Sequence, residues 1–325
     1  MPRVADGFPP IGVGTFGSDR YGPDEVAAAV ATALRLGYRL IDRASVYGNE
    51  AQIGSAIEAA MAELGIECSE LRIMTKVWND AHEPEAAVAS VRHSLADLRC
   101  DRLDVVFVHW PFPNHHAAGV DVDSRDPHAS PYDHEGFMRL WAALETLVDE
   151  GAVAALGVSN VSIAKPSLIL ADARIAPTFL EAELHPTFQQ GELFQFAVDH
   201  GIQPIGYSPL GSPSRPERDR APEDAVDLEA PAVVSIAESR GLHPAQVCLK
   251  WAVERGQIPI PFSVKEEQLR SNLEALGGEP FSPAEVDALR GVERNNRLIK
   301  RQVFLWEGAD SRLDLWDVDG RIAGR

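Results

Sequence analysis

The chain has little cysteine and no excess of basic side chains. Its 325 residues include 3 cysteines, with 49 acidic against 30 basic residues and a formal net charge of −19. Binding to nucleic acid or to an anionic membrane needs clustered basic side chains, so this charge argues against both partners. The cysteines show no metal-ligand spacing, which is typical of reduced thiols in a cytoplasmic enzyme.

Long apolar runs are missing as well. No run approaches the roughly 20 apolar residues that a membrane-spanning helix requires. Residues 1–10 contain no apolar segment of signal-peptide length. We therefore expect a cytoplasmic protein without a membrane partner.

No glycine-rich phosphate-binding motif follows the first predicted strand, as it would in a doubly wound nucleotide-binding sheet. That motif reads G-x-G-x-x-G and follows the first strand; Gly12, Gly14 and Gly17 have this spacing, but they begin inside the first β-rich run (11–16) and do not follow it. This weakens an open, doubly wound sheet as the topology of the chain.

Short apolar runs that alternate with helical patterns are what the sequence does contain. In the helical segment 83–98, for example, apolar residues recur every three or four positions and so line one face. Eight strands alternating with helices predict a single (β/α)8 TIM barrel, an α/β fold, over residues 1–325. The barrel is expected at about 8–293 and a C-terminal tail at about 294–325. The eight β-rich runs are 11–16, 38–43, 71–77, 103–109, 153–158, 178–184, 203–208 and 257–263.

Two long loops and the tail break this regular spacing. Residues 111–135 follow the fourth run, and residues 211–229 follow the seventh. Active sites of α/β barrels lie at the carboxyl ends of the strands, so we expect both loops to border the site. In the tail, Trp306 and Trp316 either cover a pocket or pack against the barrel.

Ionisable side chains stand at the ends of three successive runs. Asp42 ends the second run, Lys76 lies near the end of the third, and His109 ends the fourth; Tyr47 follows shortly after Asp42. A barrel gathers strand ends around one pocket, so these side chains are expected to meet. An ammonium beside a tyrosine lowers its pKa from about 10 toward neutral pH. Such a set can move a proton to or from an oxygen whose carbon gains or loses hydride.

A metal-dependent hydrolase on the same fold is an alternative function. Its basis is a group of histidines and aspartates in and around the loop at 111–135. None of them shows H-x-H or H-E-x-x-H spacing, so a solvated loop is favoured over a metal site. The group consists of His109, His115, His116, Asp121, Asp123, His128 and His134.

With these motifs in order, the chain resembles the aldo-keto reductase superfamily over roughly residues 8–290. The resemblance implies a TIM barrel that binds NADP(H) or NAD(H) without a Rossmann fold. It also implies hydride transfer between that cofactor and a small aldehyde or ketone, or the corresponding alcohol. A cofactor-binding redox sensor with low turnover is a further alternative. The segments that carry the resemblance are 12–15, 42–50, 75–78, 108–111, 157–160, 183–186 and 206–211.

The resemblance also implies roles for individual residues. Tyr47 would be the general acid, tuned by Lys76 and Asp42. His109 would orient the carbonyl group. Ser159 and Asn160 would contact the carboxamide of the nicotinamide, and Tyr207 would stack on its ring. Substrate contacts would come from His109, Trp78 and Trp110. The full set of implied cofactor contacts is Gly14, Thr15, Asp42, Ser159, Asn160, Glu181, Tyr207, Ser208, Leu210, Ser263 and Asn272.

Four positions depart from the family's usual pattern. Glu181 replaces a glutamine that contacts the carboxamide, and an ionised glutamate cannot donate a hydrogen bond to it. Phe262 and Gln268 stand where the family usually has a lysine and an arginine that bind the 2′-phosphate of NADP. Lys265 or Arg270 would replace them only if the loop were displaced, so the preference between NAD(H) and NADP(H) stays open. The fourth departure is Arg43, which stands beside Asp42 in place of a small residue, and the sequence gives no physical reason for it.

Overall fold

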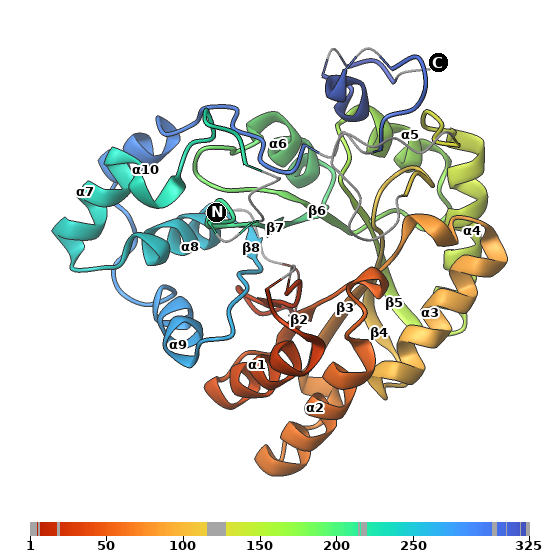
Figure 1. Cartoon of the computed structure of the whole chain (residues 1–325), viewed down its shortest axis with the longest axis horizontal. Coiled ribbons are helices and arrows are strands. Elements are labelled where there is room, and N and C mark those ends of the chain that lie inside the picture. Colours follow the sequence, from red (N-terminus) through yellow and green to blue (C-terminus); the bar gives the residue numbers. More distant parts are fainter. Residues whose placement is uncertain are drawn as a thin grey trace.

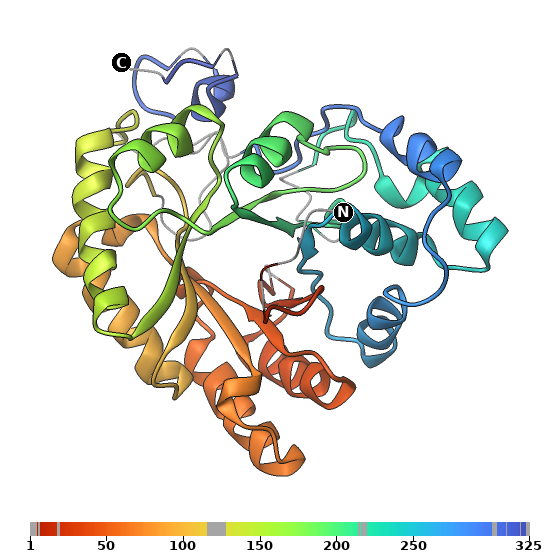
Figure 2. The same cartoon turned by 180° about the vertical axis from the view of Figure 1, so that it is seen from behind.

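The computed structural model describes residues 5, 7–17, 20–115, 128–213, 215, 220–300, 304–309, 311–318 and 320–322. One sheet of eight strands forms its centre, and each strand pairs in parallel with the next one along the chain. Helices surround this curled sheet in both views (Figures 1 and 2). The strands are β1 (Val13–Gly14), β2 (Leu40–Asp42), β3 (Arg72–Val77), β4 (Leu103–Val108), β5 (Val153–Ser159), β6 (Phe179–Glu183), β7 (Gln203–Tyr207) and β8 (Ile258–Pro259).

Main-chain hydrogen bonds close the sheet into a barrel. The amides of Gly12 and Gly14 donate to the carbonyls of Pro259 and Pro261, each at 3.0 Å. The first and last strands approach so closely that a Cβ atom on Gly14 would lie 2.9 Å from the carbonyl oxygen of Ile260, so only glycine fits. The predicted (β/α)8 barrel is confirmed, and the doubly wound alternative is wrong because the edge strands pair with each other.

The helices also follow the sequence pattern closely. At the start of α10, Ser282 forms a capping box with Glu285, and Pro283 occupies the first turn. No helix in the described part of the chain is both long and apolar enough to cross a bilayer. The helices are α1 (Pro23–Leu36), α2 (Glu50–Leu64), α3 (Pro84–Leu98), α4 (His134–Asp149), α5 (Ala164–Asp172), α6 (Gly191–Asp199), α7 (Pro231–Arg240), α8 (Pro244–Glu254), α9 (Glu266–Glu274) and α10 (Pro283–Arg290).

The interior of the barrel has an apolar floor and a polar rim. Side chains of a strand alternate between its two faces, so residues two positions apart share a face. At the floor, Gly157 leaves room for Phe107, whose ring would lie 2.4 Å from a Cβ atom at that position. The floor consists of Leu40, Met74, Val105, Phe107, Phe179, Ile205, Ile258 and Ile260. Two positions after a floor residue on their strands come the rim residues Asp42, Lys76, His109, Glu181 and Tyr207.

The described part of the tail packs against the barrel beside the end of β4. Trp110 is 2% exposed, and its ring centroid lies 5.0 Å from that of Phe304 and 5.4 Å from that of Trp316. Asp317 forms a buried ion pair with Lys165 of α5. The tail tryptophans Trp306 and Trp316 therefore pack against the barrel in one apolar cluster with Trp110, as one of the two expectations has it.

Candidate active site

The buried ammonium group of Lys76 is the centre of the polar rim. Its Nζ lies 2.6 Å and 2.8 Å from the two carboxylate oxygens of Asp42, and 2.9 Å from the carbonyl oxygen of Arg43. A second carboxylate oxygen, Oε1 of Glu181, lies 3.1 Å away. Lys76 is 1% exposed. Strands β2, β3 and β6 therefore hold one cation between two carboxylates.

These carboxylates keep Lys76 charged. Burial alone disfavours the ammonium form, but the charges of Asp42 and Glu181, together with Tyr47, outweigh it and raise the pKa of Lys76 above its ordinary value. The site therefore contains a fixed positive charge at every working pH.

Tyr47 and His109 lie next to this charge. Tyr47 ends the short 3-10 helix η1 (Ser45–Tyr47), which follows β2 directly. The Nζ of Lys76 is 5.7 Å from the centroid of the Tyr47 ring, and the His109 ring is 6.1 Å from that centroid at 81°. Trp78 packs edge-on against His109 at 4.9 Å. The structure thus brings Asp42, Tyr47, Lys76 and His109 together, as the sequence predicts. Trp78 lies beside them, whereas Trp110 is buried under the tail residues Phe304 and Trp316.

The ends of β4, β5 and β7 are joined through Asn160. Its side-chain amide donates to the carbonyl of His109 at 2.8 Å and to Oγ of Ser159 at 3.1 Å. Its amide oxygen accepts from the hydroxyl of Tyr207 at 2.7 Å. Asn160 adopts a left-handed backbone (φ 56°), which asparagine tolerates better than most residues. A polar amide and a half-exposed aromatic ring therefore stand side by side at the rim.

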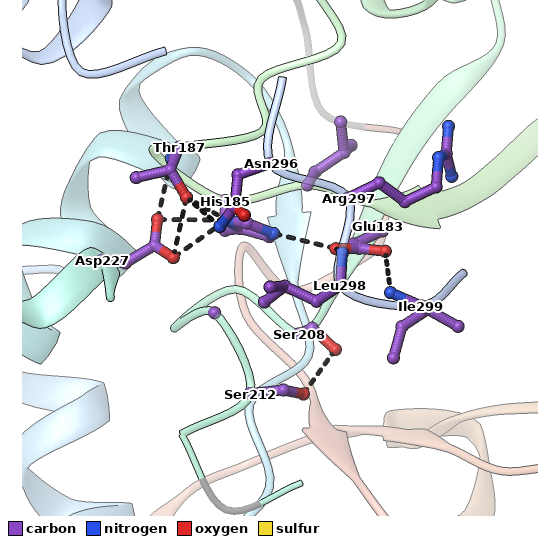
Figure 3. A network of polar contacts seen from close by, with 12 residues as sticks. Glu183, His185, Thr187, Ser208, Ser212, Asp227, Asn296, Arg297, Leu298 and Ile299 are labelled. Atoms are coloured by element: carbon purple, nitrogen blue, oxygen red, sulfur yellow. Dashed lines mark hydrogen bonds and ion pairs between the residues drawn. The ribbon is translucent and has the colours of Figure 1, made fainter. Parts of the chain in front are cut away.

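The segments after β7 and after β1 complete this face of the barrel. Ser208 and Ser212 both have positive φ angles, 51° and 43°, and their hydroxyls are 2.8 Å apart (Figure 3). Leu210 between them packs against two apolar clusters. The hydroxyl of Thr15 donates to the carbonyl of Asp42 at 2.9 Å. The loop after β7 is thereby fixed in a tight, hydroxyl-bearing turn.

Near the start of α9, Phe262 and Gln268 contact other residues of the protein. The hydroxyl of Ser263 donates to Oε1 of Gln268 at 2.6 Å. Phe262 packs edge-on against Tyr21 at 5.7 Å. Arg270 forms an ion pair with Glu266 at 2.6 Å, which compensates its charge. Further along α9, Asn272 is buried at 5% exposure.

Arg43 and Glu50 form a buried ion pair that sequence reasoning did not find. Glu50 also accepts hydrogen bonds from the hydroxyls of Thr75 at 3.2 Å and Ser94 at 3.0 Å. Burial lowers the pKa of Arg43, although Glu50 and Asp42 oppose that effect. The pair fastens the start of α2 to β2 and β3, which accounts for Arg43; the only sequence signal was an arginine seven positions before a glutamate.

A second missed network surrounds His185 (Figure 3). Its Nε2 lies 3.0 Å from Glu183, and its Nδ1 lies 3.0 Å from Asp227 in the short helix η5 (Asp227–Glu229). Glu183 also accepts hydrogen bonds from the backbone amides of Leu298 at 2.7 Å and Ile299 at 3.0 Å. The network joins the end of β6, the loop after β7 and the tail, so it supports one side of the site.

This network predicts a loss of stability at alkaline pH. Burial opposes the charge of His185, but Asp227 and Glu183 raise its pKa to about 9. A group with a raised pKa stabilises the fold fully below its unfolded pKa of about 6.5 and loses that contribution as the pH rises through about 9. We expect the contribution of His185 to the free energy of unfolding to fall by about 1–3 kcal/mol over this window, measured by urea titration at several pH values.

His185→Gln should remove the part of this pH dependence that His185 contributes, so its stability should fall less steeply above pH 6.5 than that of the unchanged protein. His93→Gln is the matched control, because the side chain of His93 is 75% exposed in its pair with Asp97. An equal alkaline slope in the His185 variant and in the unchanged protein would contradict the role of the network.

Those histidines considered for a metal site that the structure describes do not gather into a metal-binding group. His134 begins α4, where its ring contacts the hydroxyl of Tyr132 and the carboxylate of Asp172, each at 2.8 Å. In the described ranges, no group of 3 or more metal-ligand side chains is placed to hold an ion. His116, Asp121 and Asp123 lie outside the described residues.

Comparisons with known proteins agree with this fold. A family model described as "Aldo/keto reductase family" matches residues 10–294. The protein named aldo-keto reductase family 1 member A1 from Rattus norvegicus is 39% identical over 293 residues, 90% of this chain and 88% of that protein. An aldo/keto reductase of Synechocystis sp. is 36% identical over 311 residues, 95% and 93% of the two chains.

Solved structures show the same similarity. The aldose reductase from Schistosoma japonicum matches with a TM-score of 0.78 and 32% identity over 94% of each chain. An aldo-keto reductase from Bombyx mori, determined in complex with NADP, matches with a TM-score of 0.77 and 27% identity over 90% of this chain and 91% of that chain.

Fold and site together define an oxidoreductase built on a parallel barrel. The chain belongs to the aldo/keto reductase family. This membership confirms the resemblance noted in the sequence, and it gives no support to a metal-dependent hydrolase.

Proposed function

We propose that this protein reduces a small aldehyde or ketone, or oxidises the corresponding alcohol, with a nicotinamide dinucleotide. The observation that carries the proposal is the position of Lys76, whose Nζ lies 2.6 Å from Asp42 and 5.7 Å from the centroid of the Tyr47 ring. A tyrosine beside a fixed positive charge is suited to give up its proton.

In the reducing direction, Tyr47 and His109 act on the carbonyl oxygen. His109 donates a hydrogen bond that orients the carbonyl, and Tyr47 transfers its hydroxyl proton to the oxygen as the carbon gains hydride. Lys76 stabilises the phenolate that remains, and Asp42 holds Lys76 in place. Tyr47 recovers a proton from solvent before the next turnover.

The residues at the rim fit a nicotinamide dinucleotide. The amide of Asn160 and the hydroxyl of Ser159 are suited to a carboxamide, and Tyr207 presents an aromatic ring beside them. Ser208 and Ser212 offer hydroxyls in a tight turn for a pyrophosphate. When bound, the cofactor supplies or accepts the hydride.

We also propose that barrel and tail form one domain over residues 1–325, located in the cytoplasm. The backbone hydrogen bonds from Leu298 and Ile299 to Glu183 and the buried pair of Lys165 with Asp317 support a single unit. All 3 cysteines are free thiols, which is consistent with a reducing compartment.

Cofactor preference is expected to be weak. Phe262 cannot pair with a 2′-phosphate, Gln268 is bonded to Ser263, and Arg270 is paired with Glu266. Charge-assisted contacts to phosphate are the strong ones, so their loss removes most of the usual advantage of NADPH. We expect the Kd values for NADPH and NADH to lie within about tenfold, or about 1.4 kcal/mol, in fluorescence titrations. A panel of aldehydes, ketones and alcohols with both cofactors then tests turnover.

The double variant Phe262→Lys with Gln268→Arg should tighten NADPH by about tenfold or more and leave NADH nearly unchanged. Gln195→Arg on the outer helix α6 adds a positive charge elsewhere and should change neither Kd. A strong NADPH preference in the unchanged protein would contradict this reading of the phosphate site. Repeated failure to exceed a single turnover across the panel would instead support the redox-sensing alternative.

A further inference from the structure

Two buried carboxylates share the ammonium group of Lys76. Asp42 reaches it from β2 and Glu181 from β6, four strands apart in the eight-stranded order, so they approach from different sides of the barrel. Asp42 is 3% exposed and Glu181 2%. A glutamate at position 181 therefore adds a second negative charge to a site that needs only one to hold its lysine.

The two carboxylates are not equally satisfied. Both oxygens of Asp42 contact Lys76, at 2.6 Å and 2.8 Å. Glu181 contacts it through Oε1 alone, and its Oε2 is buried with no hydrogen-bond partner among the described residues. A buried charged oxygen without a partner is costly, whereas a protonated carboxyl group relieves that cost. Glu181 is therefore the carboxylate that takes up a proton first.

We propose that Glu181 is a positioning residue for proton transfer, which shares Lys76 with Asp42 and sets how much positive charge Lys76 presents to Tyr47. The proposal rests on the proposed function, because that function makes Tyr47 the acid. It gives a role to the glutamate that departs from the family's usual glutamine.

The surroundings of Glu181 define how this control depends on pH. Burial and the charge of Asp42 raise the pKa of Glu181 to about 8, with Lys76 acting in the opposite direction. The paired neighbours on the adjacent strands, Ser159 of β5 and Ile205 of β7, carry no charge. Below about pH 8, a neutral Glu181 leaves Lys76 offset by Asp42 alone. Above about pH 8, the ionised carboxylate of Glu181 offsets the charge of Lys76 further. Lys76 then stabilises the phenolate of Tyr47 less, so Tyr47 keeps its proton to a higher pH.

Glu181→Gln tests the effect on proton transfer. Turnover for carbonyl reduction is measured against pH in the whole protein with saturating cofactor. We expect the alkaline limb of the kcat profile to move to lower pH by about 0.5–1 unit, because the lost carboxylate no longer offsets Lys76. Glu181→Met also lacks the charge and should give the same shift, which separates charge from amide hydrogen bonding. Glu145→Gln, a buried carboxylate on α4, is the matched control and should leave the limb unchanged.

Thermal unfolding tests the charge on Glu181 without turnover. A carboxyl group whose pKa rises from about 4.3 unfolded to about 8 folded costs stability as the pH increases through this window. The Gln variant carries no such group. We therefore expect the Tm of Glu181→Gln, relative to the unchanged protein, to increase by several degrees between pH 5 and pH 9.

A constant Tm difference, or an unmoved alkaline limb in Glu181→Gln, overturns this proposal. If Tyr47→Phe is inactive but the alkaline limb of Glu181→Gln does not move, only the role of Glu181 is wrong and the proposed function stands. Near-normal turnover by Tyr47→Phe overturns the proposed function, and the role of Glu181 in proton transfer with it.

Discussion

Replacing Tyr47 with phenylalanine is expected to lower kcat by about 10²–10⁴-fold, because the variant keeps the ring but loses the proton that the product oxygen needs. The ring packs against His109 and Phe16, so those apolar contacts survive the change. Cofactor affinity should stay within about threefold in the same titrations, since the hydroxyl acts on the substrate oxygen. The measurement is steady-state reduction of the best carbonyl substrate.

Tyr132→Phe is the matched control for this experiment. Tyr132 also loses one hydrogen-bonding hydroxyl, which contacts His134 at 2.8 Å, but it belongs to the segment before α4. Its kcat should remain within about twofold of the unchanged protein. If both variants kept near-normal turnover, another group would have to be the acid.

Replacing Lys76 with methionine should remove both activity and stability. Without the ammonium, the phenolate of Tyr47 loses its stabilising charge, and the buried carboxylate of Asp42 loses the cation that compensates it. Breaking a buried ion pair by removing one partner typically costs about 3–5 kcal/mol. We therefore expect turnover below detection and a loss of that size in urea unfolding, partly relieved at low pH where the carboxyl groups take up protons.

Lys165→Met separates the two effects of that substitution. Lys165 is 2% exposed and pairs with the buried Asp317, so its removal also leaves a buried carboxylate without a cation. Its stability loss should be similar, whereas turnover measured on the folded fraction should stay within several-fold. Comparable loss of turnover in both variants would mean that Lys76 acts on activity only through the fold.

Much of the fold and part of the site followed from short-range sequence patterns. Apolar runs and helical spacing predict all eight strands and the helices between them, because each pattern reflects a local period. Asp42, Lys76 and His109 could be placed at one rim from sequence because each lies at or near the end of its own apolar run, and a barrel gathers the ends of its strands around one pocket. Their catalytic roles stay predictions that the variants above will test.

The partners of buried charges could not be predicted in this way. Arg43 and Glu50 are close in sequence, but the hydroxyl of Ser94 that also satisfies Glu50 comes from α3. His185 depends on Asp227, 42 positions away, and Glu183 depends on tail residues more than 100 positions away. Such pairings are set by which elements the closed barrel places side by side, and no local period records them.

The sequence by itself determined the strands, the helices and the position of the charged residues at the strand ends, because hydrophobic periodicity is a local property of the chain. Only the tertiary structure decided that Lys76 lies between Asp42 and Glu181, that Glu183 and Asp227 hold His185, and that the tail covers Trp110. These arrangements exist because closing the barrel removes the charged groups from water, and a buried charge is stable only when the fold brings a partner to it.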